Sequence, residues 1–118
     1  MTPPGWTPYR RPEDDELLGY LVVSEQGTTP LTVFGHPLAG PGDRDAAVEL
    51  LQRRGLAVLA EPWWFTAEDG TGFPVQIMSA YPDRVTVARA DYGFVSHDAE
   101  RHSLAVPVGE QLRPYVRP

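Results

Sequence analysis

The sequence of 118 residues contains no cysteine, no lysine and no asparagine. The absence of cysteine excludes disulfides, thiolate metal ligands, iron–sulfur clusters and cysteine nucleophiles, and it suits the reducing cytoplasm in which we expect this protein. The absence of lysine excludes a Schiff-base amine, a phosphate-loop lysine and a serine–lysine dyad. Without asparagine, glutamine is the only amide side chain left for bidentate contacts with adenine.

Basic clusters and long apolar runs are missing as well. All 10 basic residues are arginines spread along the chain, and 16 acidic residues bring the net charge to -6. Nucleic-acid binding normally starts from a cluster of basic side chains. A membrane-spanning helix needs about 20 apolar residues in a row, and the N-terminus lacks the pattern of a signal peptide. We therefore expect a soluble protein with no nucleic-acid partner and no membrane association.

Prolines gather at both ends of the chain. Four of the 13 prolines lie in residues 1–12 around Trp6 and Tyr9, a composition that favours an extended polyproline arm over helix or sheet. The last seven residues have a similar composition around Tyr115. A chain of this length is close to the usual size of one domain. The predicted organisation is an N-terminal arm over 1–12, a single domain over 13–111 and a C-terminal tail over 112–118.

The clearest pattern runs through residues 62–91, where apolar and other side chains alternate with a period of two. The alternation holds over 73–78 and resumes over 85–88. Between them, the proline and the aspartate of residues 81–84 supply the chemistry of a tight turn. Upstream, the glycines of residues 68–72 allow a hairpin loop after the aromatic run. This region predicts a three-strand antiparallel meander.

Two more strand regions flank it. Residues 17–24 and 31–34 are apolar runs joined by a glycine-containing turn over 25–28, which predicts a hairpin. Residues 103–108 predict a last strand. Because proline cannot donate a hydrogen bond, Pro107 places that strand at a sheet edge.

One helix has well-marked ends. Asp43 is a good N-cap, and Arg53 and Arg54 lie in the last turn, where cations are favoured. Gly55 fits the left-handed position that often follows a helix. Arg54 is expected at the edge of the apolar stripe, with its guanidinium capping backbone carbonyls. The stripe that faces a sheet consists of Ala46, Ala47, Leu50 and Leu51.

The patterns combine into an α+β fold. Residues 56–60 are apolar without a clear period and fit either a further helical turn or a short strand. The predicted order is a hairpin, one helix, a three-strand antiparallel meander and a last edge strand. We expect this antiparallel sheet to curl toward a small, partly open barrel.

Residues 97–102 form the one local group that resembles a metal or acid–base site. Five residues separate its histidines, which places them on opposite faces of a strand and about 140° apart around a helix. Neither structure converges them on one ion. No serine has the glycine-flanked, strand–turn–helix setting of a nucleophile. We predict no catalytic residue, no metal and no cofactor, and retain this group as a polar cluster of His97, Asp98, Glu100 and His102.

The double tryptophan carries the most information. On a strand, Trp63 and Phe65 point to one face and Trp64 points to the other, so one helix cannot cover all three. Trp64 must be covered by the chain's own tail, by a closing strand or by a partner. Large aromatic side chains of this kind anchor protein interfaces. The predicted partner-binding residues are Trp6, Tyr9, Trp64, Met78 and Tyr115.

These observations favour a non-catalytic function. The hypothesis is a small acidic interaction or accessory module that binds a protein partner, or a second copy of itself, through an aromatic and proline-rich surface. The alternative is a small-molecule-binding or enzymatic domain with an aromatic pocket and arginine, histidine and carboxylate groups. The polar cluster is its only support in the sequence.

Overall fold

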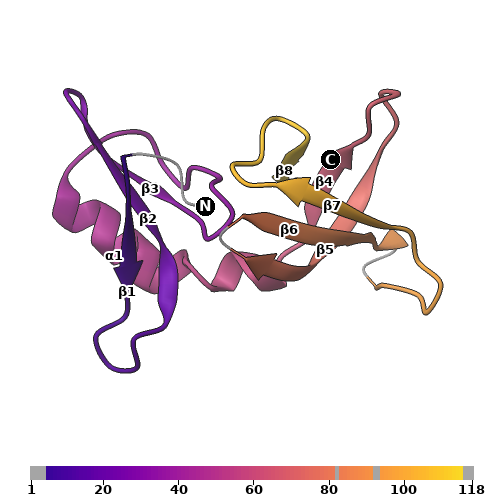
Figure 1. Cartoon of the computed structure of the whole chain (residues 1–118), viewed down its shortest axis with the longest axis horizontal. Helices are drawn as coiled ribbons and strands as arrows, with labels where there is room; N and C mark the ends of the chain where they lie inside the picture. The colour runs from indigo at the N-terminus through magenta and orange to yellow at the C-terminus, as the bar shows by residue number, and fades with distance from the viewer. Residues whose placement is uncertain (1–4, 82, 92–93, 116–118) are drawn as a thin grey trace.

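The computed structural model describes residues 5–81, 83–91 and 94–115, and it confirms an α+β fold with antiparallel sheets (Figure 1). One α-helix and one 3-10 helix lie between the first three strands and the last five. The elements in chain order are β1 (Trp6–Arg10), β2 (Leu17–Ser24), β3 (Gly27–Leu31), α1 (Arg44–Arg54), η1 (Ala57–Ala60), β4 (Trp63–Thr66), β5 (Gly72–Tyr81), β6 (Arg84–Arg89), β7 (Arg101–Ala105) and β8 (Leu112–Pro114).

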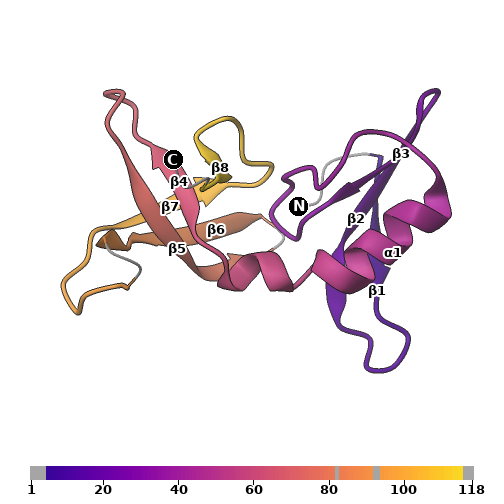
Figure 2. The ribbon, with the colours of Figure 1, turned by 180° about the vertical axis from the view of Figure 1, so that it is seen from behind.

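The strands form two sheets that lie side by side along the molecule (Figures 1 and 2). Sheet A has the order β1-β2-β3, and sheet B has the order β7-β6-β5-β4-β8. The predicted hairpin is present, but its second strand, β3, covers 27–31 and not 31–34, because pairing with β2 already begins at Gly27. The predicted meander is present as β4, β5 and β6. The expected barrel is not, because α1 and η1 carry the chain away from sheet A before sheet B begins. Sheet B stays open, with β7 and β8 as its two edges.

Helix α1 packs on one face of sheet A. The backbone N–H of Ala46 donates to Asp43 Oδ2 at 3.2 Å, which confirms the predicted N-cap. Leu51 is fully buried and packs with Ala47 against Leu18 and Leu21 of β2. The small residues of the predicted stripe allow this close approach, although Ala46 itself is exposed.

The C-terminal end of α1 differs from the prediction at two residues. Gly55 is right-handed, with φ -53°, so the left-handed cap is wrong. Glycine is needed there for another reason: a methyl group at this position would collide with the carbonyl oxygen of Leu18. Arg54 does not cap carbonyls but forms an ion pair with Glu61 at 2.7 Å.

The apolar residues 56–60, whose structure the sequence left open, form the 3-10 helix η1. Val58 is buried, and its carbonyl accepts a hydrogen bond from Trp63 Nε1 at 2.9 Å. Trp63 also meets Phe34 edge-on, with ring centroids 5.1 Å apart. Phe34, which follows β3, and Val58 of η1 therefore belong to the same core as the inner face of sheet B. The other buried residues of this core include Phe65, Phe73, Val75, Val85, Val87, Leu104, Val106 and Leu112.

The two proline-rich ends contain strands rather than polyproline segments. β1 pairs with β2, and β8 pairs with β4 in the register Trp64↔Arg113. Both are edge strands, where proline is tolerated because its missing N–H can face away from the neighbouring strand. The tail and the arm expected from composition are thus part of the two sheets over the residues described.

β7 begins two residues earlier than the predicted last strand and ends before Pro107. It lies at a sheet edge, as predicted. In the part of the chain that the structure describes, no helix is both long enough and apolar enough to cross a membrane.

Candidate functional site

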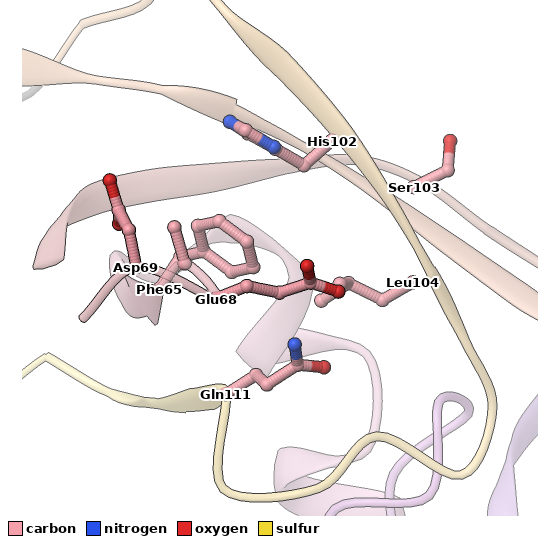
Figure 3. Close-up of a pocket in the computed structure, with 8 residues that line it drawn as sticks. Phe65, Glu68, Asp69, His102, Ser103, Leu104 and Gln111 are labelled. Atoms are coloured by element: carbon pink, nitrogen blue, oxygen red, sulfur yellow. The ribbon is translucent and has the colours of Figure 1, made fainter. Parts of the chain in front are cut away.

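Two adjoining hollows lie at the end of sheet B where β4 runs into its turn. They share Ala67, Glu68 and Gln111. The inner hollow measures about 450 Å³ and is lined by Phe65, Ala67, Glu68, Asp69, His102, Ser103, Leu104 and Gln111 (Figure 3). The outer hollow measures about 460 Å³ and is lined by Trp64, Thr66, Ala67, Glu68, Glu110, Gln111 and Arg113.

The alternation of side chains along β4 produces this arrangement. Phe65 points into the core and is 4% exposed, whereas Trp64 points to the outer face and is 36% exposed. The backbone N–H of Thr66 donates to the carbonyl of Gln111 at 2.8 Å, which holds the start of β8 beside the end of β4. The turn that follows is closed by a bond from the N–H of Ala67 to the carbonyl of Thr71 at 2.8 Å.

Aromatic rings form one wall beside the inner hollow. The rings of Phe65 and Phe73 meet edge-on with centroids 5.6 Å apart, and the imidazole of His102 lies 4.6 Å from Phe65. His102 Nε2 pairs with the carboxylate of Glu100 at 2.8 Å. The guanidinium of Arg89 lies over the Phe73 ring, 4.6 Å from its centroid. His102 on one side and Arg89 on the other therefore fix the rings of Phe65 and Phe73 in the free protein.

Carboxylates border the inner hollow. The backbone N–H of Thr71 donates to Asp69 Oδ1 at 2.9 Å, and this bond lowers the pKa of Asp69 below its usual range. Asp69 is therefore ionised at neutral pH. Glu68 reaches toward Leu104 across the hollow (Figure 3). Two acidic side chains beside an apolar floor suit a ligand that is positively charged and partly apolar.

The serine of the inner hollow is not placed for catalysis. Ser103 Oγ lies 3.2 Å from Thr86 Oγ1 of β6, on the outer face of the sheet. Its hydroxyl points away from His102 (Figure 3). His102 and Ser103 are neighbours on one strand, so their side chains project to opposite faces and cannot share a proton. This geometry does not support a serine–histidine nucleophile.

The predicted polar cluster is brought together only in part. Glu100 and His102 are in contact, with Glu100 Oε2 2.8 Å from His102 Nε2, and His102 lines the inner hollow. His97 and Asp98 lie on the exposed loop before β7, where Asp98 accepts a hydrogen bond from Ser96. The described residues contain no set of three or more histidine, aspartate or glutamate side chains that could hold a metal ion.

The outer hollow is built around Trp64. The indole stacks on the ring of Tyr115, with centroids 5.9 Å apart and planes inclined by 25°. It also lies over Gly72, where a methyl group would come within 2.6 Å of the indole. Pro74 and Arg113 are its partners in register on either side. Tyr115, from the predicted C-terminal tail, covers part of Trp64, whereas residues 6–10 of the predicted arm pair with β2 in sheet A.

The five predicted partner-binding residues lie in different places. Trp64 and Tyr115 are stacked, and Met78 is 43% exposed at the irregularity of β5. Trp6 and Tyr9 belong to sheet A. Trp6 packs on Tyr20 with centroids 5.1 Å apart, and the Tyr9 hydroxyl accepts a hydrogen bond from Gln52. Only the first three lie on sheet B.

Sequence reasoning placed Glu68 and Asp69 on an ordinary turn and gave no role to Gln111 or Arg113. The turn was located correctly, but the curl of sheet B brings it beside β7 and the start of β8. No local pattern encodes that approach, because the segments are more than 30 residues apart in the chain.

Comparison of this chain with protein-family models, with curated proteins and with solved structures finds no match. The site itself therefore carries the functional argument.

Proposed function

We propose that this protein is a non-catalytic interaction module that binds a protein partner, or a second copy of itself, at the end of sheet B. The observation that supports this most is the stack of Trp64 on Tyr115 beside the outer hollow. A tryptophan that stays 36% exposed on an open sheet face is the type of residue that anchors protein interfaces.

The rings of Trp64 and Tyr115 are already stacked in the free protein, so a partner need not order them. Stacked rings lose little conformational freedom when a partner arrives, and pairs at this spacing add about 0.5–1.5 kcal/mol beyond the area that they bury. Pro74 and the stem of Arg113 extend the apolar surface on each side of the indole. An ion pair between Arg113 and Glu110 at 3.3 Å forms part of the rim. An apolar centre with a polar rim is the usual anatomy of an interface.

A cysteine-free composition suits a reducing compartment, so the partner that we propose is cytoplasmic. The net charge of -6 disfavours nucleic acid as that partner.

Trp64→Ser tests the proposal, and Val23→Ser is its matched control. Val23 is a 69% exposed apolar residue on sheet A. Tagged wild type and both variants are purified from the source cell, and the co-purifying proteins are quantified by mass spectrometry. Light scattering gives the mass of each protein alone. We expect Trp64→Ser to lose a partner or to fall from dimer to monomer, while Val23→Ser behaves as wild type. If Trp64→Ser matches wild type in both measurements, the proposal fails.

Small-molecule binding is the second candidate, and the inner hollow favours it. Its volume lies in the range of ligand sites, and Phe65, His102, Glu68 and Asp69 offer aromatic faces and negative charge to an organic cation. A thermal-shift screen of organic cations and metabolites tests this candidate. Saturable stabilisation by one compound, lost in Glu68→Gln, would support it.

A further inference from the structure

The free edge of β7 presents a defined set of backbone groups. The N–H of Arg89 donates to the carbonyl of Glu100 at 2.9 Å. Hydrogen-bonded pairs recur at every second residue of an antiparallel ladder, so His102 and Leu104 also bond toward β6. No strand pairs with the far side of β7 among the residues described. The backbone groups that turn to this free edge belong to Arg101, Ser103 and Ala105.

This edge borders the inner hollow. Three consecutive residues of β7, from His102 to Leu104, line it. The side chain of Ser103 is bonded to Thr86 on the outer face, so its backbone is the part that faces the hollow. Gln111, which precedes the other edge strand β8, lines the opposite side. The hollow is thus the gap between the two unpaired edges of an open, curled sheet.

We propose that this gap takes an extended, basic segment of a protein partner, which adds to β7 as a further strand. This inference rests on the proposed function and names the partner's chemistry. Addition of a strand to a free edge is a common mode of peptide recognition, in which backbone bonds give affinity and alternate side chains give specificity. The floor of Phe65 and Leu104 accepts apolar side chains from one face of such a strand.

Charge decides which segment fits. Glu68 and Asp69 line the gap, and the N–H of Thr71 stabilises the ionised form of Asp69. A third carboxylate, that of Glu100, contacts the imidazole of His102, which also lines the gap. Arg89 is engaged with Asp91 and Arg113 with Glu110, and Arg101 alternates with His102 along β7 and so projects to the outer face of the sheet, away from the apolar floor. A segment with alternating basic and apolar residues complements this surface, and an acidic one is repelled.

The probes are defined peptides on the full chain. The first is a fluorescent nine-residue peptide of alternating lysine and valine. The second replaces lysine by glutamate, and the third carries N-methyl groups on alternate backbone nitrogens, which removes the donors needed for strand pairing. Lysine amide serves as a small cation. The affinities of the peptides are measured by fluorescence anisotropy, and that of lysine amide is measured by its competition with the fluorescent peptide. Hydrogen exchange of the Ser103 amide reports whether that N–H becomes bonded on binding.

The matched protein variants are Ser103→Pro and Ser103→Ala. Both lose the side-chain bond to Thr86, but only proline removes the backbone N–H that faces the gap. Proline is tolerated at an edge strand when its nitrogen faces away from the sheet, so we expect both variants to fold. Circular dichroism checks that they do. The double variant Glu68→Gln and Asp69→Asn tests the charge.

We expect saturable binding of the lysine–valine peptide and slower exchange of the Ser103 amide. Ser103→Pro should weaken binding by about tenfold or more, while Ser103→Ala should stay within about twofold of wild type. The charge variant should bind several times more weakly. The glutamate and N-methyl peptides should not bind to wild type, and the N-methyl result does not depend on how the variants fold.

Other outcomes overturn the inference. Equal binding of the glutamate peptide removes the charge argument, and equal affinity of Ser103→Pro and Ser103→Ala removes the strand argument. Saturable binding of lysine amide, displaced by no peptide, points to the small-molecule candidate instead. A fall in mass of the free protein on Ser103→Pro points to a second copy as the occupant. If no peptide binds while Trp64→Ser still loses its partner, this inference fails and the proposed function stands.

Discussion

The two sheets of this protein differ in how completely their surfaces are covered. One face of sheet A carries α1, and the edge of β3 is closed by two backbone bonds between Thr28 and Gly42 at 2.8 and 3.1 Å. Sheet B has a similar buried inner face, but its outer face exposes Trp64 and Met78, and the edge at β7 has no neighbouring strand among the residues described.

The proposed binding role of sheet B rests on this difference. An uncovered edge and an exposed aromatic face are liabilities that folded proteins normally hide with a helix, a loop or charges. Helix α1 packs on the smaller sheet, sheet A, whereas the larger sheet B stays open. Over the described residues, sheet A also has a free edge, at β1, but α1 covers one of its faces and the loop at Gly42 covers its β3 edge. We therefore call sheet A with α1 the closed half, and the end of sheet B, where we propose that binding occurs, the open half. Four substitutions test this comparison.

Leu51→Ala should give the largest effect. Leu51 is fully buried between α1 and sheet A, so the truncation should lower the free energy of unfolding by about 2–5 kcal/mol. Glu49→Ala, on the exposed side of the same helix, should stay within about 0.5 kcal/mol of wild type. Urea unfolding measures both. Equal losses would mean that α1 does not close sheet A as described.

Gly55→Ala should come next. The added methyl group would collide with the Leu18 carbonyl, and overpacking of this kind costs about 1–3 kcal/mol. Gly40→Ala is the control, because nothing lies within 4 Å of a methyl group there. A stabilising Gly55→Ala would show that the helix end has more room than its contacts imply. The same urea titrations compare the two.

On the open half, His102→Gln should cost less. It removes ring contacts with Phe65 and Phe73, a loss of about 0.5–1.5 kcal/mol. His97→Gln, on the exposed loop, should change stability by less than about 0.5 kcal/mol. Identical values for the two histidines would remove the distinction that the structure draws within the polar cluster.

The smallest effect concerns pH and the junction between the halves. Burial lowers the pKa of His36 below 6.5, and its ring meets Trp63 edge-on at 5.1 Å. The unfolded chain therefore binds this proton more readily than the folded protein does. The contribution of neutral His36 is complete above pH 6.5, and it is lost as the pH falls through that value toward the lowered pKa.

His36→Gln should make the fall in stability from about pH 8 to about pH 5 shallower than in wild type. Thermal unfolding across this range measures the two slopes. A steeper slope in the variant would show that the imidazole is not the group that titrates at this junction.

Local chemistry in the sequence determined much of the fold. The Asp43 cap depends on a side chain three residues from the N–H whose hydrogen bond it accepts, and the pairing of Tyr81 with Arg84 places the turn between β5 and β6 at the predicted residues. The period of two placed Trp63 and Phe65 on the buried face and Trp64 on the other. These features follow from the nearest neighbours in the chain, and so they could be predicted.

Features that depend on distant segments could not. Glycine is required at position 55 because the Leu18 carbonyl lies too close for a methyl group. The proline-rich ends form strands because they pair with the edges of β2 and β4. The inner hollow joins the turn after β4 to β7, although more than 30 residues separate them. Composition and period determined which residues prefer strand, helix or turn. Only the packing of the two sheets decided which edge stayed open, because that depends on contacts between parts of the chain that carry no local record of one another.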